Sequence, residues 1–336
     1  MRVALTLDFR NAASRRRPWR EFWEDGLWLL REAEAMGFDA LLVQEHFFTD
    51  DGYAPSLPIF LTLLAERTRR ARIGAYLYIL PLHNPARVAQ ESAVLDQLSG
   101  GRLDVTVGIG HRAAEYRAHG LDPRSRPSRM EEALDVLRLA WKGERFDYHG
   151  RHYRFDAVEV QPTPLQSPHP PLWCGATTAA AAERAGRRGL HLHGSSADPG
   201  VTAAYREALA AAGHAARAFR VSNPWSITVT DETPDAVWQR NRALYFERWD
   251  FYRRIREEMG DPALDYGLAA SPERYRANEL IGRPEQVLAT LEPLVRRLGL
   301  TDLVLFGPAS GIDWRGEGYA SVRRFAEDLL PTLASW

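Results

Sequence analysis

The polar pair Glu45 and His46 directly follows the apolar run Ala40–Val43. That run comes after a helix stop at Met36-Gly37, and its pattern predicts a strand buried on both faces. Catalytic side chains gather at the carboxyl ends of such strands in parallel α/β folds, and histidine changes its charge near neutral pH. Glu45 and His46 are therefore candidates for acid–base chemistry. The alternative is that Glu45 caps the next element and that His46 is a loop histidine with satisfied hydrogen bonds.

Strand and helix signals alternate along the chain, a pattern typical of βα units that build a parallel sheet. Eight apolar runs are predicted strands: Val3–Phe9, Ala40–Val43, Arg72–Leu80, Leu103–Gly110, Pro171–Gly175, Leu190–His193, Phe219–Thr230 and Thr301–Phe306. The predicted helices cover about Glu21–Met36, Pro58–Thr68, Pro85–Leu98, Arg129–Trp141, Ala179–Gly186, Val201–Ala212, Pro284–Leu298 and Ser321–Leu330. This repeat predicts a (β/α)8 TIM barrel with insertions.

One barrel domain is expected over residues 1–336, because no change in composition indicates a linker. Residues 146–160 alternate aromatic and polar side chains around His149-Gly150, which predicts an inserted β-hairpin. The segment 241–278 is the longest excursion from the repeating pattern, and we interpret it as a candidate lid.

The composition bounds the possible functions. Hydrophobic residues make up 45% of the 336 residues, enough for a large core, and the net charge of −1 argues against a general nucleic-acid or membrane-surface role. The single cysteine, Cys174, excludes an intrachain disulfide. No signal peptide or membrane span is expected, which indicates a cytoplasmic protein. Lys142, the only lysine, lies at a predicted helix end, so Schiff-base chemistry is not expected.

Short motifs occur in a fixed order through nearly the whole chain: Gly37-Phe38-Asp39 before Gln44–Thr49, Arg72-Ile73-Gly74 before Leu80–Pro85, Leu95–Arg102, Val107–Gly110, Gly175–Thr178 and Ile281–Val287. Together they make the chain resemble the bacterial luciferase-like, flavin-dependent monooxygenase family. The resemblance implies that the protein binds reduced FMN supplied by a separate reductase and uses O2 to oxidise a small organic substrate. The substrate stays open, because one scaffold serves many reactions.

The resemblance also implies roles for particular residues. His46 matches the family's histidine beside the flavin, with an implied role in proton transfer, and Glu45 would orient that imidazole or support it from further out. Phe47 stands where luciferase has a second histidine, so light emission need not follow. A non-proline cis peptide is implied between Tyr76 and Leu77, beneath the flavin. A homodimer is implied through the helices near residues 58–68 and 85–98.

Gly108, Ile109 and Gly110 are expected to contact the flavin, because glycine lets the backbone approach a bound ring closely. Luciferase has a reactive cysteine and a phosphate-binding arginine where this chain has Gly108 and Ile109. The phosphate must therefore be held mainly elsewhere. Arg112 is a possible replacement, although a solvated loop arginine is the simpler interpretation.

The phosphate is expected at the helix start within Gly175-Ala176-Thr177-Thr178. The free N–H groups of that turn and the helix dipole form an anion site. The hydroxyls of Thr177 and Thr178 add donors, and Ser195, after the sixth predicted strand, would close the other side. The alternative is that one of the threonines caps its own helix.

Other interpretations remain open. The family's deazaflavin-using branch shares the barrel and commonly has Asp-His where this chain has Glu45-His46. His191 and His193 point to one face of a predicted strand, and with His46 and Glu45 they would suit a metal-dependent barrel hydrolase. If the cofactor is a flavin, no metal is expected.

The loop after the fourth predicted strand carries two further signals. Val107–Ala113 matches the dinucleotide pattern G-x-G-x-x-A, but it lies in mid-chain and lacks the acidic residue that such a site needs. Glu115 and Tyr116 follow, and they either line the site or face solvent.

Overall fold

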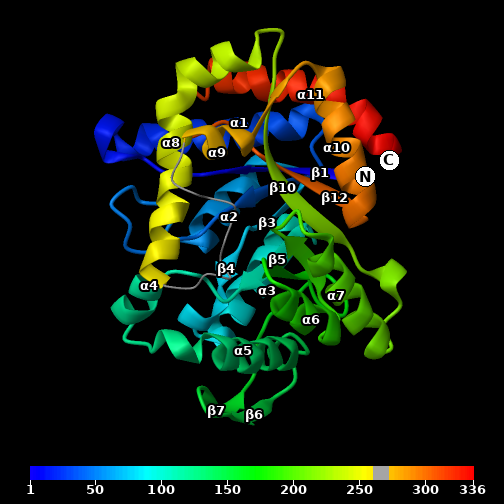
Figure 1. The fold of residues 1–336 in the computed structure, drawn as a ribbon. Helices are drawn as coiled ribbons and strands as arrows, with labels where there is room; N and C mark the ends of the chain where they lie inside the picture. Colours follow the sequence, from blue (N-terminus) through cyan, green and yellow to red (C-terminus); the bar gives the residue numbers. More distant parts are fainter. Residues whose placement is uncertain (260–271) are drawn as a thin grey trace.

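The structure is a computed structural model that describes residues 1–259 and 272–336. Its centre is a closed ring of parallel strands (Figure 1). In ring order these are β1 (Arg2–Leu7), β2 (Ala40–Val43), β3 (Arg72–Ala75), β5 (Leu103–Gly108), β8 (Leu172–Ala176), β9 (His191–Gly194), β10 (Val221–Val229) and β12 (Asp302–Phe306). β12 pairs with β1 and closes the ring, which confirms the predicted TIM barrel.

Helices form the outer layer (Figure 1): α1 (Trp19–Met36), α2 (Leu57–Arg67), α3 (Pro85–Ser99), α5 (Arg126–Ala140), α6 (Ala179–Arg187), α7 (Pro199–Ala211), α10 (Pro284–Leu298) and α11 (Glu317–Ser335). Each lies close to its predicted range. α1 ends at Gly37, whose φ of 103° lets its N–H reach the carbonyls of Ala33 and Glu34. Only glycine adopts this conformation without strain, so Gly37 fixes where the chain enters β2.

Alternation along the strands divides the side chains between two environments. In β1, Leu5 and Leu7 are buried in the main hydrophobic core, between the strands and the helices. Ala4 packs instead with Leu42 and Val304 in a small separate cluster inside the barrel. The interior is therefore filled by a layer of apolar side chains and is not an open channel.

Ion pairs close the amino-terminal end of the barrel. Asp302 is 2.7 Å from both Arg2 and Arg220, and Arg72 is 2.8 Å from Asp104. Burial raises the pKa of Asp104, although the hydrogen bond and charge of Arg72 oppose the shift. With this end occupied by paired charges, the carboxyl-terminal mouth remains for a ligand.

The third predicted strand is interrupted. β3 ends at Ala75, and a short strand β4 (Tyr78–Ile79) pairs with β5 after a non-proline cis peptide between Tyr76 and Leu77. The predicted cis peptide is therefore confirmed. It lies at the carboxyl-terminal mouth, where β3 leaves the ring.

The insertions differ in how well they were predicted. β6 (Phe146–His149) and β7 (Arg154–Val158) form an antiparallel hairpin where one was expected. β11 (Glu279–Gly282) pairs in parallel with the end of β10 and is not among the predicted strands. The candidate lid includes parts of α8 (Pro234–Met259) and α9 (Pro272–Ala277). Residues 260–271 lie outside the described residues, so the lid stays a prediction.

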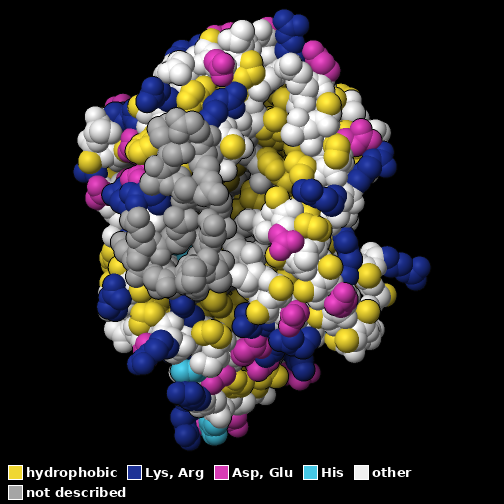
Figure 2. All heavy atoms as spheres, viewed as in Figure 1, with side chains coloured by type: hydrophobic (Ala, Val, Ile, Leu, Met, Phe, Trp, Pro, Cys, Tyr) yellow, Lys and Arg dark blue, Asp and Glu magenta, His cyan; other side chains and the backbone are white. Residues whose placement is uncertain are grey.

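On the face shown in Figure 2, acidic and basic side chains are interspersed and do not gather into one large patch of a single sign. This distribution agrees with the net charge of −1. Within the described parts of the chain, none of the helices combines the length and apolar character that a membrane crossing requires.

Candidate active site

β2 carries residues 44–46 to the carboxyl-terminal mouth of the barrel. The side-chain oxygen of Gln44 accepts hydrogen bonds from the hydroxyls of Tyr53 and Tyr252, the latter at 3.3 Å. Tyr53 belongs to the loop after β2 and Tyr252 to α8, and their hydroxyls are 2.8 Å apart. This network ties α8 to the end of β2, so α8 forms one wall of the site.

His46 lies in a buried aromatic pocket, with 6% of its surface exposed. Its ring centroid is 4.9 Å from Tyr53, 5.2 Å from His111 and 5.6 Å from Phe251. Burial and the neighbouring charge of His46 lower the pKa of His111 to about 3, so His111 is neutral at physiological pH. A histidine with restricted access to water, at the carboxyl-terminal end of a barrel strand, suits proton transfer.

The partner of His46 is Glu115, on the short helix α4 (Ala113–Ala118). The His46 Nδ1 is 3.0 Å from Glu115 Oε1, which also accepts the Phe47 N–H at 2.8 Å. Although burial raises the pKa of Glu115, hydrogen bonds from His46 and Phe47 and the charge of Arg112 lower it overall. Glu115 is therefore buried and ionised, so of the two expectations for it, lining the site is the correct one.

Arg112 holds the same loop from the other side. Its Nη1 donates to the Phe47 carbonyl at 2.9 Å and lies 3.4 Å from Glu115 Oε1. Only 12% of its side chain is exposed. The interpretation of Arg112 as a solvated loop residue is therefore wrong, and its contacts are with the loop that carries His46.

Glu45 does not orient His46, so that expectation is wrong. Its Oε2 accepts the Ile79 N–H at 2.9 Å and is 2.9 Å from His83 Nε2. Adjacent strand residues point to opposite faces, and this separates Glu45 from His46. Burial lowers the pKa of His83, but the charge and hydrogen bond of Glu45 raise it overall. Glu45 thus links Ile79, which follows the break between β3 and β4, to His83, which precedes α3.

The predicted flavin-contacting glycines lie under the side chain of Leu77. A Cβ on Gly108 would be 2.8 Å from Leu77 Cδ1, and one on Gly175 would be 2.2 Å from Leu77 Cδ2. A side chain at either position would therefore displace the end of the Leu77 side chain, and our expectation that the backbone is bare at these positions was incomplete. Gly110 has φ of 64°, and a Cβ on it would be 2.6 Å from Ile79 Cγ2. Leu77, Gly108 and Gly175 thus lie together at the mouth, and we call these three residues the Leu77 platform.

Polar groups lie beside this platform. The ring of Tyr76 is 4.9 Å from that of His193, edge to face, and His193 stacks on Trp173 at 4.4 Å. The Trp173 Nε1 and the Thr106 Oγ1 are buried and have no hydrogen-bond partner among the residues described. Thr106 and Trp173 are neighbours in the β5–β8 register. Ile109 follows, and its carbonyl accepts the hydroxyl of Tyr116 at 2.6 Å.

The start of α6 brings the predicted phosphate residues together. The Thr178 hydroxyl accepts the Ala181 N–H at 3.4 Å, so Thr178 is the N-cap, as the alternative interpretation expected. A capping hydroxyl still has its own proton to donate. The Ser195 N–H donates to the Ala176 carbonyl at 3.2 Å, which brings Ser195 beside this turn. Thr177 is half-buried. These groups can hold an anion.

His191 and His193 share a face, as predicted, and both rings pack against Trp173. The His191 Nδ1 accepts the Arg220 N–H at 3.0 Å, and the His193 Nδ1 is hydrogen-bonded to the Ser222 hydroxyl. Burial lowers their pKa values to about 4 and about 3. Over residues 1–259 and 272–336, no group of three or more histidine, cysteine or acidic side chains could hold a metal ion.

A buried ion cluster at Arg248 on α8 was not predicted from the sequence. Its Nε is 3.1 Å from Asp8 Oδ2, its Nη2 donates to the Gly307 carbonyl at 2.8 Å, and its Nη1 is 3.9 Å from Glu279. Arg248 is 1% exposed. Burial raises the pKa of Glu279, with Arg248 opposing the shift. Arg248 therefore joins α8 to the ends of β1 and β12 and to β11.

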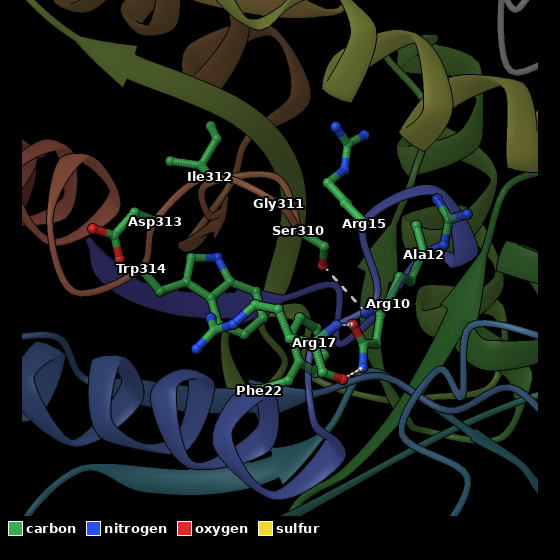
Figure 3. A pocket seen from close by; sticks show the side chains of 11 residues that line it. Arg10, Ala12, Arg15, Arg17, Phe22, Ser310, Gly311, Ile312, Asp313 and Trp314 are labelled. Atoms are coloured by element: carbon green, nitrogen blue, oxygen red, sulfur yellow. Dashed lines mark hydrogen bonds between the residues drawn. The ribbon is translucent and has the colours of Figure 1, made fainter.

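A cavity of about 270 Å³ lies beside the His46 pocket, between the loops that follow β1 and β12 (Figure 3). Arg10 lines it, and the Arg10 guanidinium lies 4.2 Å from the centre of the Phe251 ring, which also contacts His46. One aromatic layer thus separates this cavity from His46. Each of its arginines, Arg10, Arg15 and Arg17, already contacts a carboxylate, that of Asp51, Glu247 and Asp25 respectively.

Comparisons with known proteins agree with this geometry. A family model described as luciferase-like monooxygenase matches residues 1–302. The chain is 26% identical over 335 residues to the oxygenase component of the flavin-dependent trigonelline monooxygenase of Acinetobacter baylyi, covering 94% of this chain and 91% of that protein. It is 36% identical over 166 residues to the FMNH2-dependent dimethylsulfone monooxygenase of Pseudomonas putida, covering 47% and 45% of the two chains.

The fold has close counterparts among solved structures. The monooxygenase RslO1 from Streptomyces bottropensis superposes with a TM-score of 0.83 at 24% identity, covering 99% of this chain and 100% of that one. At this identity the likeness shows the fold. The chain spans about half the length of several curated relatives that it matches at 34–36% identity.

Proposed function

The chain belongs to the luciferase-like monooxygenase family, and on that premise we propose that it uses reduced FMN and O2 to oxidise a small organic substrate. One observation carries the proposal: a buried His46–Glu115 pair lies at the same barrel mouth as the Leu77 platform and the start of α6. A proton-transfer group, a surface for a planar ring and an anion site are the three parts that such a reaction needs.

The residues would divide the work as follows. Reduced FMN, when bound, supplies the electrons with which O2 is activated. Tyr76, Leu77, Gly108 and Gly175 would support the ring, while the backbone of Ile109 and Gly110 follows the platform. The aromatic pocket excludes water from His46, which would give and take protons at the reacting atoms. Catalysis would then depend on positioning and proton transfer, because the cofactor carries the electron chemistry.

The choice of cofactor can be tested by binding. F420-dependent proteins are also found among the relatives, so deazaflavin is the alternative cofactor. Titration of the purified protein with reduced FMN and with reduced F420, each followed by fluorescence under anaerobic conditions, compares them directly. We expect tighter binding of FMN. A clear preference for F420 would replace the monooxygenase proposal with a deazaflavin-dependent oxidoreductase.

We expect Thr178→Ala to weaken FMN binding by about 10- to 150-fold, since a hydrogen bond to a charged group is worth about 1.5–3 kcal/mol. Riboflavin lacks the phosphate, so its affinity should change little. The ratio of the two affinities therefore separates loss of a phosphate contact from loss of the helix cap, which affects both ligands alike. Thr178→Ser keeps the hydroxyl and serves as the control. Equal affinities of the wild-type protein for FMN and riboflavin would place the phosphate elsewhere.

The proposal includes a homodimer and a separate reductase as partners. α2 and α3 pack side by side and expose the apolar side chains of Ile59, Leu63, Val94 and Leu98. A groove of about 720 Å³ runs beside them, lined by α2, α3 and residues of the hairpin segment. Exposed apolar side chains that gather in this way mark an interaction surface, and a second copy of the chain is the partner that the family resemblance implies.

Replacing both Ile59 and Leu98 by Asp should convert the dimer into a monomer, because two buried charges without partners would oppose the interface. Light scattering at micromolar concentration measures the mass directly. Phe246→Asp places a charge at an exposed aromatic side chain on α8 instead and should leave the mass unchanged. A monomeric wild-type protein would remove this part of the proposal. The proposal also keeps the cytoplasmic location, for which a single buried thiol is suitable.

A further inference from the structure

The contacts of His46 point to one residue that controls its protonation. We propose that Glu115 is the positioning residue that holds the proton of His46 on Nδ1, so that Nε2 is the atom that exchanges a proton with the bound reactants. This inference adds to the proposed function. It rests on that function only for the reaction in which His46 exchanges a proton. The tautomer itself is a property of the protein without any ligand.

The hydrogen bonds around Glu115 determine the direction of its contact with His46. Its Oε1 accepts the Phe47 N–H at 2.8 Å and lies 3.4 Å from a nitrogen of Arg112. An ionised carboxylate can only accept, so the His46 Nδ1, 3.0 Å away, has to donate. In a neutral imidazole only one nitrogen carries a proton. Nε2 is therefore left with a free lone pair.

Glu115 and Arg112 also fix the loop on which His46 stands. Glu115 takes the N–H of Phe47, and Arg112 donates to its carbonyl at 2.9 Å, so both sides of this residue are held. The carboxylate is thus held in place by contacts other than its hydrogen bond with the imidazole. Its 0% exposed side chain is shielded from water, which strengthens a charged hydrogen bond relative to one at the surface.

The other groups around His46 are unsuited to this role. Glu45 belongs to the opposite face of β2 and is bound to Ile79 and His83. His111 meets the ring edge to face at 5.2 Å, and Tyr53 lies at 4.9 Å with its hydroxyl engaged by Gln44 and Tyr252. Arg112 is the charged group closest to the pair, but a guanidinium only donates hydrogen bonds and cannot accept one from the imidazole. Among the described residues, only Glu115 accepts a hydrogen bond from the imidazole.

Nitrogen-15 NMR of histidine-labelled protein without flavin tests the assignment, because the shifts of the two ring nitrogens report the tautomer. The His46 signals are identified by their loss in His46→Gln. We expect the Nδ1–H form in the wild-type protein and in Glu115→Asp, which keeps the charge. The Phe47 N–H would hold the amide oxygen of Glu115→Gln at the same place, so that variant should also keep the Nδ1–H form. Glu115→Leu removes the acceptor and should populate the Nε2–H form. Glu45→Gln should leave the tautomer of His46 as in the wild type.

The activity of the loaded enzyme provides the second readout. Glu115→Leu should lower turnover by about 10- to 100-fold, the range known for loss of the group that orients a metal-binding histidine. An Nε2–H tautomer in the wild-type protein, or an unchanged tautomer in Glu115→Leu, would overturn the inference. The protein could instead show the expected tautomers but fail to bind reduced FMN. That result would overturn the proposed function and leave the assignment of Glu115 intact.

Discussion

His46→Ala should lower turnover with reduced FMN and O2 by about 100-fold or more, the usual scale for loss of a general acid or base. The fold should persist, because His46 packs among aromatic side chains that contact one another as well, such as Tyr53 and Phe251. Most of the FMN affinity should remain, since the platform and the α6 start lie on other strands. Steady-state O2 consumption and FMN titration of the same preparations measure the two quantities.

The exposed His149 provides the control for loss of a histidine. It pairs with Asp156 on the hairpin, with 49% of its side chain exposed, and has no part in the site. His149→Ala should therefore leave turnover unchanged. If His46→Ala turns over at the wild-type rate, His46 does not transfer the proton and the site has been assigned wrongly.

Arg248→Met should lower the free energy of unfolding by about 3–5 kcal/mol, the cost of removing one partner from a buried ion pair. The methionine fills much of the same volume but leaves Asp8 and Glu279 buried without their counter-charge. Both carboxylates would then have to take up protons or draw in water. Urea-induced unfolding, followed by circular dichroism, gives the free energy and shows whether the transition stays cooperative.

A surface arginine sets the scale for this experiment. Arg87 pairs with Glu91 along α3 with 77% of its side chain exposed, and Arg87→Met should cost only about 0.3–0.5 kcal/mol. A similar small loss for Arg248→Met would mean that the cluster does not hold α8 against the barrel. Contacts other than those of Arg248 would then have to hold Tyr252, on α8, against the site.

The barrel could be predicted from the sequence because its signals are local. Gly37 stops a helix, Ala40–Val43 is too short and too apolar for anything but a buried strand, and the same alternation recurs around the ring. β11 was missed because its signal is not local. Glu279–Gly282 has four residues, and only its pairing with β10 makes it a strand.

The roles of the site residues remain predictions, and the structure corrects the expected contacts of Glu45 and Arg112. The chemistry of His46 follows from its place at the end of β2, but Glu45 was assigned to orient it only because the two are adjacent. The period of two along a strand already indicates that adjacent residues point apart. The true partner, Glu115, lies sixty-nine positions further along the chain, and no local pattern connects them. Likewise, the sequence shows Arg248 only as one of several charged residues in a predicted helix. Its buried contacts with Asp8 and Glu279 depend on how the chain folds.

Rapid mixing of oxygenated buffer with the anaerobic complex of the protein and reduced FMN tests the central claim most directly. Reoxidation of the flavin is followed by its absorbance, in the wild-type protein, in His46→Ala and in buffer alone. The account predicts that the wild-type protein changes the time course of reoxidation from that of free FMN, and that His46→Ala changes it again. A time course that is the same with the protein as without it would contradict the account.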